Sequence, residues 1–123
     1  MNTLFLILAG IFGGLGVAFG AFGAHALRDR RSEDKLETFE TGVRYQMYHA
    51  LALLLAALAA TAGPGSIWIR LAGWLFVAGM LVFSGSLYLL AIRGKRWFGA
   101  ITPFGGLAFI AGWGCLAVFA LNV

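Results

Sequence analysis

The sequence predicts an all-α polytopic membrane protein: a four-transmembrane-helix bundle with a short amphipathic helix between the first two spans. Two observations lead to this fold class. The chain of 123 residues is 61% hydrophobic and 11% charged, with a mean hydropathy of +0.89. A protein this small could not hide so much apolar surface in a water-soluble core. Its charged residues also leave four long uncharged runs, at residues 1–27, 45–69, 71–92 and 97–123.

Each uncharged run is long enough to cross a membrane. A helix needs about 20 residues to span a hydrocarbon layer of roughly 30 Å. Backbone amides find no water to bond inside lipid, so each run should be helical. We therefore expect one integral membrane domain over residues 1–123. Its spans are predicted at about residues 4–27, 44–62, 67–92 and 103–122.

Small residues mark one face of the first span and one face of the last. Glycine weakens a helix, so a stripe of glycine has a packing reason, which in lipid is the close approach of a neighbouring helix. A glycine-lined route for a ligand or ion is the alternative. A stripe of Phe and Leu runs beside the first glycine stripe, one residue earlier in each turn. The glycines predicted to pack are Gly13, Gly16, Gly20, Gly23, Gly105 and Gly112.

The segment Arg28–Arg44 holds all five acidic residues of the chain and five of its nine basic residues. Ser32 is placed to cap a helix whose first turn carries acidic residues, which suit the helix dipole. Apolar residues then recur every three or four positions, which predicts an amphipathic helix at the membrane surface. It either bends at Gly42 or runs straight into the second span, so residues 33–62 form two helices or one. The simpler alternative is a solvated connection between two spans.

Two further boundaries follow from proline and glycine. Gly63-Pro64-Gly65 ends the second span sharply. Thr102-Pro103 resembles an N-cap followed by the first residue of a helix, so the fourth helix is predicted to start at Pro103.

The basic residues predict how the chain is oriented. Eight of them lie in Arg28–Arg44 and Arg93–Arg96, whereas the loop between the second and third spans holds Arg70 alone. The positive-inside rule therefore places loops 28–43 and 93–102 in the cytoplasm and both termini outside.

Polar residues within the spans are the candidate ligand-binding residues, because ionisable groups inside a membrane often mark functional sites. We expect them to meet in one polar patch near the cytoplasmic face. The alternative is a set of interhelical hydrogen bonds that sets the register of the helices, with the arginine reaching to lipid phosphate. The candidates are His25, Arg44, Tyr45, His49, Ser84, Ser86 and Tyr88.

Several kinds of chemistry are not supported by the sequence. Two histidines with no third ligand in a span fall short of a metal site, and no nucleophile motif occurs. The uncharged runs contain no carboxylate to relay protons. The net charge of +4 is small and clustered, unlike that of a nucleic-acid-binding protein. We predict no catalytic residue, no metal, no cofactor and no nucleic-acid partner.

Four blocks of sequence resemble a known family. They are GAFGAHAL (20–27), LETFETGVRYQMYHALALL (36–54), FSGSLY (83–88) and ITPFGGLAFIAGW (101–113). Together they are similar to the bacterial membrane family called "domain of unknown function 423", which has small eukaryotic transmembrane relatives. The resemblance implies a four-span protein of the bacterial cytoplasmic (inner) membrane. It brings no activity, substrate or catalytic residue with it.

Two hypotheses about function follow. The first is a non-enzymatic helix bundle that acts by assembly or by binding lipid or another amphiphile, with residues 28–44 as the contact region. Its partners would be membrane lipid and a second copy of the chain or a small membrane protein. The alternative is a small oligomeric transporter or permeation protein with a polar site near His25, Tyr45 and His49.

Overall fold

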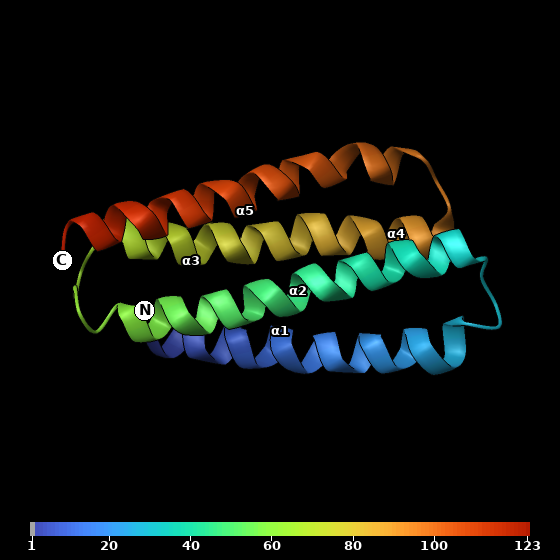
Figure 1. The fold of residues 1–123 in the computed structure, drawn as a ribbon, viewed down its shortest axis with the longest axis horizontal. Coiled ribbons are helices and arrows are strands. Elements are labelled where there is room, and N and C mark those ends of the chain that lie inside the picture. Colours follow the sequence, from blue (N-terminus) through green and yellow to red (C-terminus); the bar gives the residue numbers. More distant parts are fainter. Residues whose placement is uncertain (1) are drawn as a thin grey trace.

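The computed structural model describes residues 2–123 and, over this range, consists of helices joined by short turns. The helices form long antiparallel rods (Figure 1). The first rod is α1 (Asn2–Phe22), extended by the π-helical turn η1 (Gly23–Leu27), and the second is α2 (Glu33–Ala59). The third combines α3 (Ile67–Gly79), the π-helical turn η2 (Met80–Ser84) and α4 (Gly85–Arg93), and the last is α5 (Trp97–Leu121).

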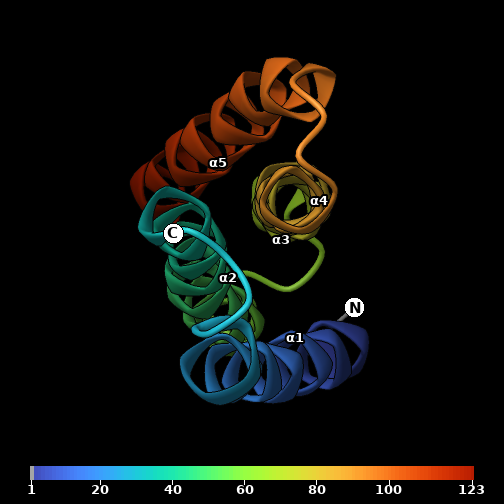
Figure 2. The same ribbon diagram turned by 90° about the vertical axis from the view of Figure 1, so that its right-hand side faces the viewer.

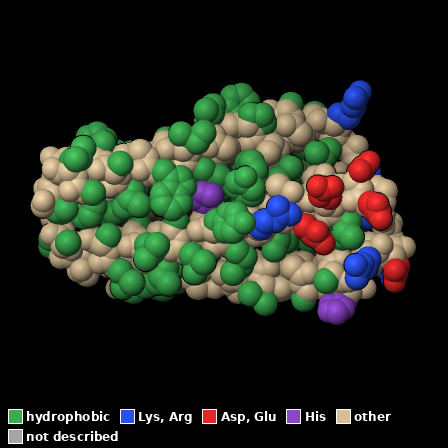
Figure 3. Space-filling model, viewed as in Figure 1, with side chains coloured by type: hydrophobic (Ala, Val, Ile, Leu, Met, Phe, Trp, Pro, Cys, Tyr) green, Lys and Arg blue, Asp and Glu red, His purple; other side chains and the backbone are tan. Residues whose placement is uncertain are grey.

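Three of these rods are long and apolar enough to cross a membrane. They cover Asn2–Leu27, Ile67–Arg93 and Trp97–Leu121, with mean hydropathies of 2.2, 2.2 and 2.0. The rod α2 falls outside this group because its first turns are charged and Gln46 and His49 interrupt its apolar part. The charged side chains gather at the end of the bundle where α2 begins (Figure 3). The architecture is therefore that of a polytopic membrane protein.

The rods form a layered bundle rather than a square one. Seen along the rods, α2 and the α3–α4 rod lie in the middle, with α1 packed on α2 and α5 packed on the α3–α4 rod (Figure 2). The main core cluster lies between them and includes Leu53, Phe76 and Phe109. At its N-terminal end α1 also reaches α3, where the ring of Phe5 fills the space left by Gly73. This contact ties α1 to both central rods.

The charged segment and the second span form one helix. Ser32 caps α2 as predicted, its side chain accepting a hydrogen bond from the backbone N–H of Lys35 at 3.4 Å. Thr41 starts no new helix, because its hydroxyl donates to the carbonyl of Glu37 within α2. Gly42 is not a bend but a contact point, where a Cβ would lie 2.8 Å from the ring of Tyr88. The charged segment therefore continues without a break into the predicted second span.

The prediction that the fourth helix starts at Pro103 is wrong. The helix α5 begins at Trp97, and Pro103 lies inside it. Proline removes the amide that would bond to the carbonyl four residues back. Transmembrane helices tolerate this where Ser or Thr hydroxyls and neighbouring helices compensate the freed backbone groups. The carbonyl freed by Pro103 is that of Gly99, whereas the hydroxyl of Thr102 lies 3.3 Å from the carbonyl oxygen of Phe98 and bonds to Ser86 of α4, which ties this turn of α5 to the α3–α4 rod.

The small-residue stripes face neighbouring helices at most positions. In α1, a Cβ on Gly16, Gly20 or Gly23 would meet side chains of α2. In α5, a Cβ on Gly105 would meet the backbone of Phe83, and one on Gly112 would lie 2.7 Å from the ring of Phe76. At Gly13 a Cβ would meet nothing within 4 Å, so this residue lies outside the contact with α2.

The close approach at Gly105 yields a first prediction. A methyl group in Gly105→Ala would lie 2.7 Å from the backbone Cα of Phe83, which cannot move aside as a side chain can. We expect this variant to lose roughly 1–3 kcal/mol of unfolding free energy through overpacking. Thermal unfolding in a mild detergent measures the effect. The matched control, Gly13→Ala, should be neutral or gain up to about 1 kcal/mol from helix propensity; an equal loss in both variants would contradict the packing at Gly105.

Candidate functional site

The polar side chains inside the bundle form bridges between helices. Most of these bridges start from α2, which contributes Gln46, His49 and the carbonyl of Gly42. Among residues 2–123, no buried side-chain nitrogen or oxygen is left without a hydrogen-bond partner. This pattern matches the interhelical alternative, in which hydrogen bonds between helices set their register.

One bridge joins three helices through Gln46. Its side-chain amide donates from Nε2 to the carbonyl of Phe12 in α1 at 2.7 Å, and its Oε1 accepts from the hydroxyl of Tyr88 in α4. Gln46 is 3% exposed. Our sequence reasoning named Tyr88 but missed Gln46. The available clue was its place three residues after Val43 on the apolar stripe of α2, where a buried amide needs a partner.

A second set of bridges involves the two serines of the α3–α4 rod. The hydroxyl of Ser84 donates to the carbonyl of Gly42 in α2 at 2.7 Å. Ser86 donates to the carbonyl of Phe83 at 2.9 Å and bonds to the hydroxyl of Thr102 in α5. Ser84 closes the π-helical turn η2, which changes the face that the following residues present. The rod is thereby bonded to α2 on one side and to α5 on the other.

His49 joins α2 to α5 through Nε2, while Nδ1 is bonded within α2. Nδ1 lies 2.8 Å from the carbonyl of Tyr45, and Nε2 lies 3.1 Å from the indole Nε1 of Trp113. A carbonyl only accepts and an indole N–H only donates, so the ring is neutral with its proton on Nδ1. The imidazole also stacks on Phe109, with ring centroids 3.5 Å apart. Neither nitrogen is free for a ligand. Trp113 was missed, although a tryptophan this far inside α5 lies away from the usual interfacial belts.

The predicted single patch of His25, Tyr45 and His49 is not assembled in the structure. Tyr45 and His49 lie side by side, with ring centroids 6.3 Å apart, and the ring of Tyr45 also packs on Phe83 at 4.8 Å. His25 lies on η1 and is exposed, as is Arg44 on α2. Over residues 2–123 no group of three or more His, Cys, Asp or Glu side chains is placed to hold a metal ion.

An apolar groove opens between α1 and α4 near the charged end of the bundle. Its volume is about 430 Å³, and α2 contributes to its wall through Phe39. A smaller hollow of about 160 Å³ shares Phe19 and Tyr88 with it and lies farther from the charged end, with Gln46 and Gly85 in its wall. We call the first the α1–α4 groove and the second the deep hollow. The groove is lined by Ala18, Phe19, Phe22, Phe39, Tyr88 and Ile92.

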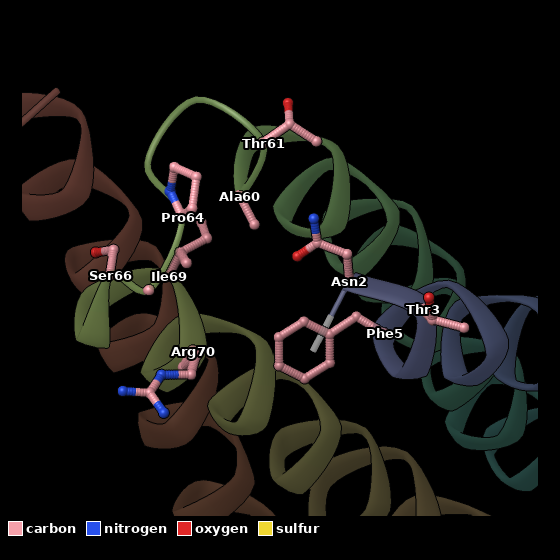
Figure 4. A pocket seen from close by; sticks show the side chains of 10 residues that line it. Asn2, Thr3, Phe5, Ala60, Thr61, Pro64, Ser66, Ile69 and Arg70 are labelled. Carbon is pink, nitrogen blue, oxygen red and sulfur yellow. The ribbon is translucent and has the colours of Figure 1, made fainter.

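A third pocket lies at the opposite end of the bundle. It has a volume of about 510 Å³ and is formed where the start of α1 meets the turn between α2 and α3. Figure 4 shows Asn2 and Phe5 of α1 on one side and Pro64 and Ile69 on the other. Its one charged residue, Arg70, is exposed, as is Thr61. This pocket has polar residues in its wall, among them Asn2, Ser66 and Arg70, whereas the α1–α4 groove is lined almost entirely by apolar side chains and is the candidate site for an apolar ligand.

Comparisons with known proteins identify a family and several relatives that resemble this chain. Residues 19–106 match the family described as "Protein of unknown function (DUF423)". The chain is 45% identical over 119 residues to the "UPF0382 membrane protein YwdK" of Bacillus subtilis, covering 97% of each chain. It is 40% identical over 122 residues to the "UPF0382 inner membrane protein YgdD" of Escherichia coli strain K12, covering 99% of this chain and 92% of the relative. No solved structure gives a significant match.

The bridge between His49 and Trp113 can be tested by a double-mutant cycle. His49→Phe keeps an aromatic ring on Phe109 but leaves the indole N–H unbonded, which should cost roughly 1–3 kcal/mol of unfolding free energy. Combined with Trp113→Phe, we expect a coupling energy of roughly 0.5–2 kcal/mol. Thermal unfolding in mild detergent supplies the four stabilities. His25→Phe serves as the control and should change little because His25 is exposed; a coupling energy of zero would refute the bridge.

Proposed function

The chain belongs to the DUF423 family of membrane proteins, and from this premise we propose that it acts without catalysis in the bacterial inner membrane, by binding a membrane amphiphile in the α1–α4 groove. The name of the Escherichia coli relative, an inner membrane protein, supports the location. The groove is the observation that carries the proposal. It is an apolar recess that lies along the helices and continues into the deep hollow.

The surroundings of the groove suit an acyl chain. Phe19, Phe22 and Phe39 give it aromatic walls, and its one hydroxyl, on Tyr88, is already committed to Gln46. In lipid, an occupant gains little from the hydrophobic effect and is held by close van der Waals contact. An acyl chain that lies along the groove contacts several aromatic rings at once. This supports a lipid or a similar amphiphile over a polar metabolite.

The polar residues support a structural role over an enzymatic or transport role. A catalytic His49 would need a free ring nitrogen, and both of its nitrogens are bonded to protein groups. A polar transport station would need His25 beside Tyr45 and His49, and His25 is exposed on η1. We therefore prefer amphiphile binding to the transporter alternative. Assembly with a second copy, or with a small membrane protein through residues 28–44, remains a prediction of the same hypothesis.

Filling the deep hollow tests the proposal. Gly85 lines this hollow, and a Cβ there would meet nothing within 4 Å, so Gly85→Leu should occupy the space without disturbing the fold. We expect it to reduce the retention of lipid on the purified protein roughly tenfold, which corresponds to about 1.4 kcal/mol of binding free energy. Native mass spectrometry in mild detergent counts the retained molecules.

The matched control is Gly14→Leu. Gly14 also has open space around its Cβ, but it lies on α1 away from the groove. This variant should retain lipid as the parent chain does. If Gly85→Leu and the parent retain the same amount, or if the parent retains no lipid, the groove is not the binding site.

The orientation of the chain gives a separate prediction. We expect the charged end, with Arg28–Arg44 and Arg93–Arg96, to face the cytoplasm because the basic residues gather there. In a Cys115→Ser background, Lys95→Cys should react with a membrane-impermeant thiol reagent only after the cells are opened. Thr61→Cys, in the turn at the opposite end, should react in intact cells. The reverse pattern would invert the topology.

A further inference from the structure

We propose that the occupant of the α1–α4 groove is an anionic phospholipid whose phosphate binds Arg31 and Lys35 at the end of α4. This inference rests on the proposed function and specifies its ligand class. One acyl chain would begin in the groove, at the lipid glycerol, and extend into the deep hollow. The head group would lie at the mouth, next to the first turns of α2.

Arg31 holds a positive charge at the mouth of the groove. Its Nη2 donates to the carbonyl of Ile92, a residue that lines the groove, at 3.2 Å. Its Nη1 donates to the carbonyl of Arg30 at 3.0 Å. A guanidinium carries five N–H donors, so these two bonds fix its position and leave donors for a phosphate. The side chain is therefore already anchored where a head group would lie.

Lys35 supplies a second positive charge beside the same helix end. Ser32 caps α2, which places Lys35 in its first turn, and the ammonium lies close to Gly94, the C-cap of α4. A Cβ built on Gly94 would be 2.9 Å from Nζ of Lys35. Gly94 also has a positive φ of 71°, a conformation that glycine adopts without strain. Arg31, just before α2, and Lys35, in its first turn, thus both lie at the C-terminal end of α4.

The charge balance of this end favours an anionic partner. The acidic residues of the chain all lie between Asp29 and Glu40, and eight basic residues share this end with them. The excess comes from Arg93, Lys95 and Arg96, directly after Ile92. Figure 3 shows the charges collected at this end, with hydrophobic side chains over much of the remaining surface on that face. A lipid whose head group carries a net negative charge would therefore be attracted to this end of the bundle.

The position of the groove along the bundle agrees with a phospholipid. The α3–α4 rod rises about 1.5 Å per residue, and a hydrocarbon layer of roughly 30 Å measured from Ile67 would end near Leu87. The residues Tyr88 and Ile92 would then lie at the level of the lipid glycerol and head group, and Gly85 at the upper part of the acyl chains. The charged mouth would therefore lie at the level of the phospholipid head group, and the deep hollow at the level of its acyl chains.

The test uses the full-length chain in nanodiscs that contain equal amounts of phosphatidylglycerol and phosphatidylcholine. After extraction into mild detergent, native mass spectrometry reports which lipid is retained. We expect the parent to prefer phosphatidylglycerol, by roughly fivefold for each contributing cation. Arg31→Gln and Lys35→Gln should each reduce this preference. Arg70→Gln, which removes the same charge at the opposite end of the bundle, should keep it.

The outcomes separate this inference from the proposed function. If both lipids are retained equally and Gly85→Leu still reduces retention, the groove binds lipid but the head-group site is wrong. An equal loss of preference in Arg70→Gln would attribute the effect to general surface charge and would also overturn the site. Retention that is insensitive to Gly85→Leu would remove the groove itself. Arg31 also bonds to the end of α4, so thermal unfolding of Arg31→Gln and Lys35→Gln checks that both variants are folded. If Arg31→Gln loses the preference only because it is unfolded, and Lys35→Gln keeps the preference, the phosphate site is wrong.

Discussion

The structure depends on one constraint: a polar group buried between helices in a membrane has to find its partner within the protein. The helix α2 carries most of these groups and is therefore the centre of the bundle. Gln46 bonds α2 to α1 and α4, the carbonyl of Gly42 accepts from Ser84, and His49 bonds α2 to α5. Each bond is short-ranged and directional, so together they set the rotation and register of all the rods around α2.

Glycine and aromatic residues then decide where the bundle is closed and where it is open. The glycine face of α1 packs closely on α2 through Gly16 and Gly23. This packing turns the neighbouring phenylalanine stripe of α1 toward the α3–α4 rod. Near the start of α1, Phe5 fills the space at Gly73 and closes the contact. Toward the charged end, Phe19 and Phe22 line the α1–α4 groove instead. One amphipathic arrangement of α1 therefore produces both a closed core and an open recess.

The proposed function rests on this difference between the closed core and the open α1–α4 groove. The most chemically capable side chain in the spans, His49, is used to hold α5 in place, with both nitrogens engaged. The groove offers contact area and shape, while the cations at its mouth offer charge without a buried carboxylate opposite them. Such a combination suits a molecule that is itself part apolar and part charged. On the proposed function, the bundle is a frame whose recess takes an acyl chain of a membrane amphiphile.

The sequence by itself determined the membrane class, the rods, the Ser32 cap and most of the packing glycines, because these depend on local composition and spacing. It also selected Ser84, Ser86, Tyr88 and His49 as polar residues in need of partners. Only the tertiary structure decided which groups form hydrogen bonds with these residues. Phe12, Gln46 and Trp113 are brought to them by helices distant in the chain, and periodicity carries no information about that. The same holds for Pro103, which lies inside α5 rather than at its start, and for the groove, which exists only between packed helices.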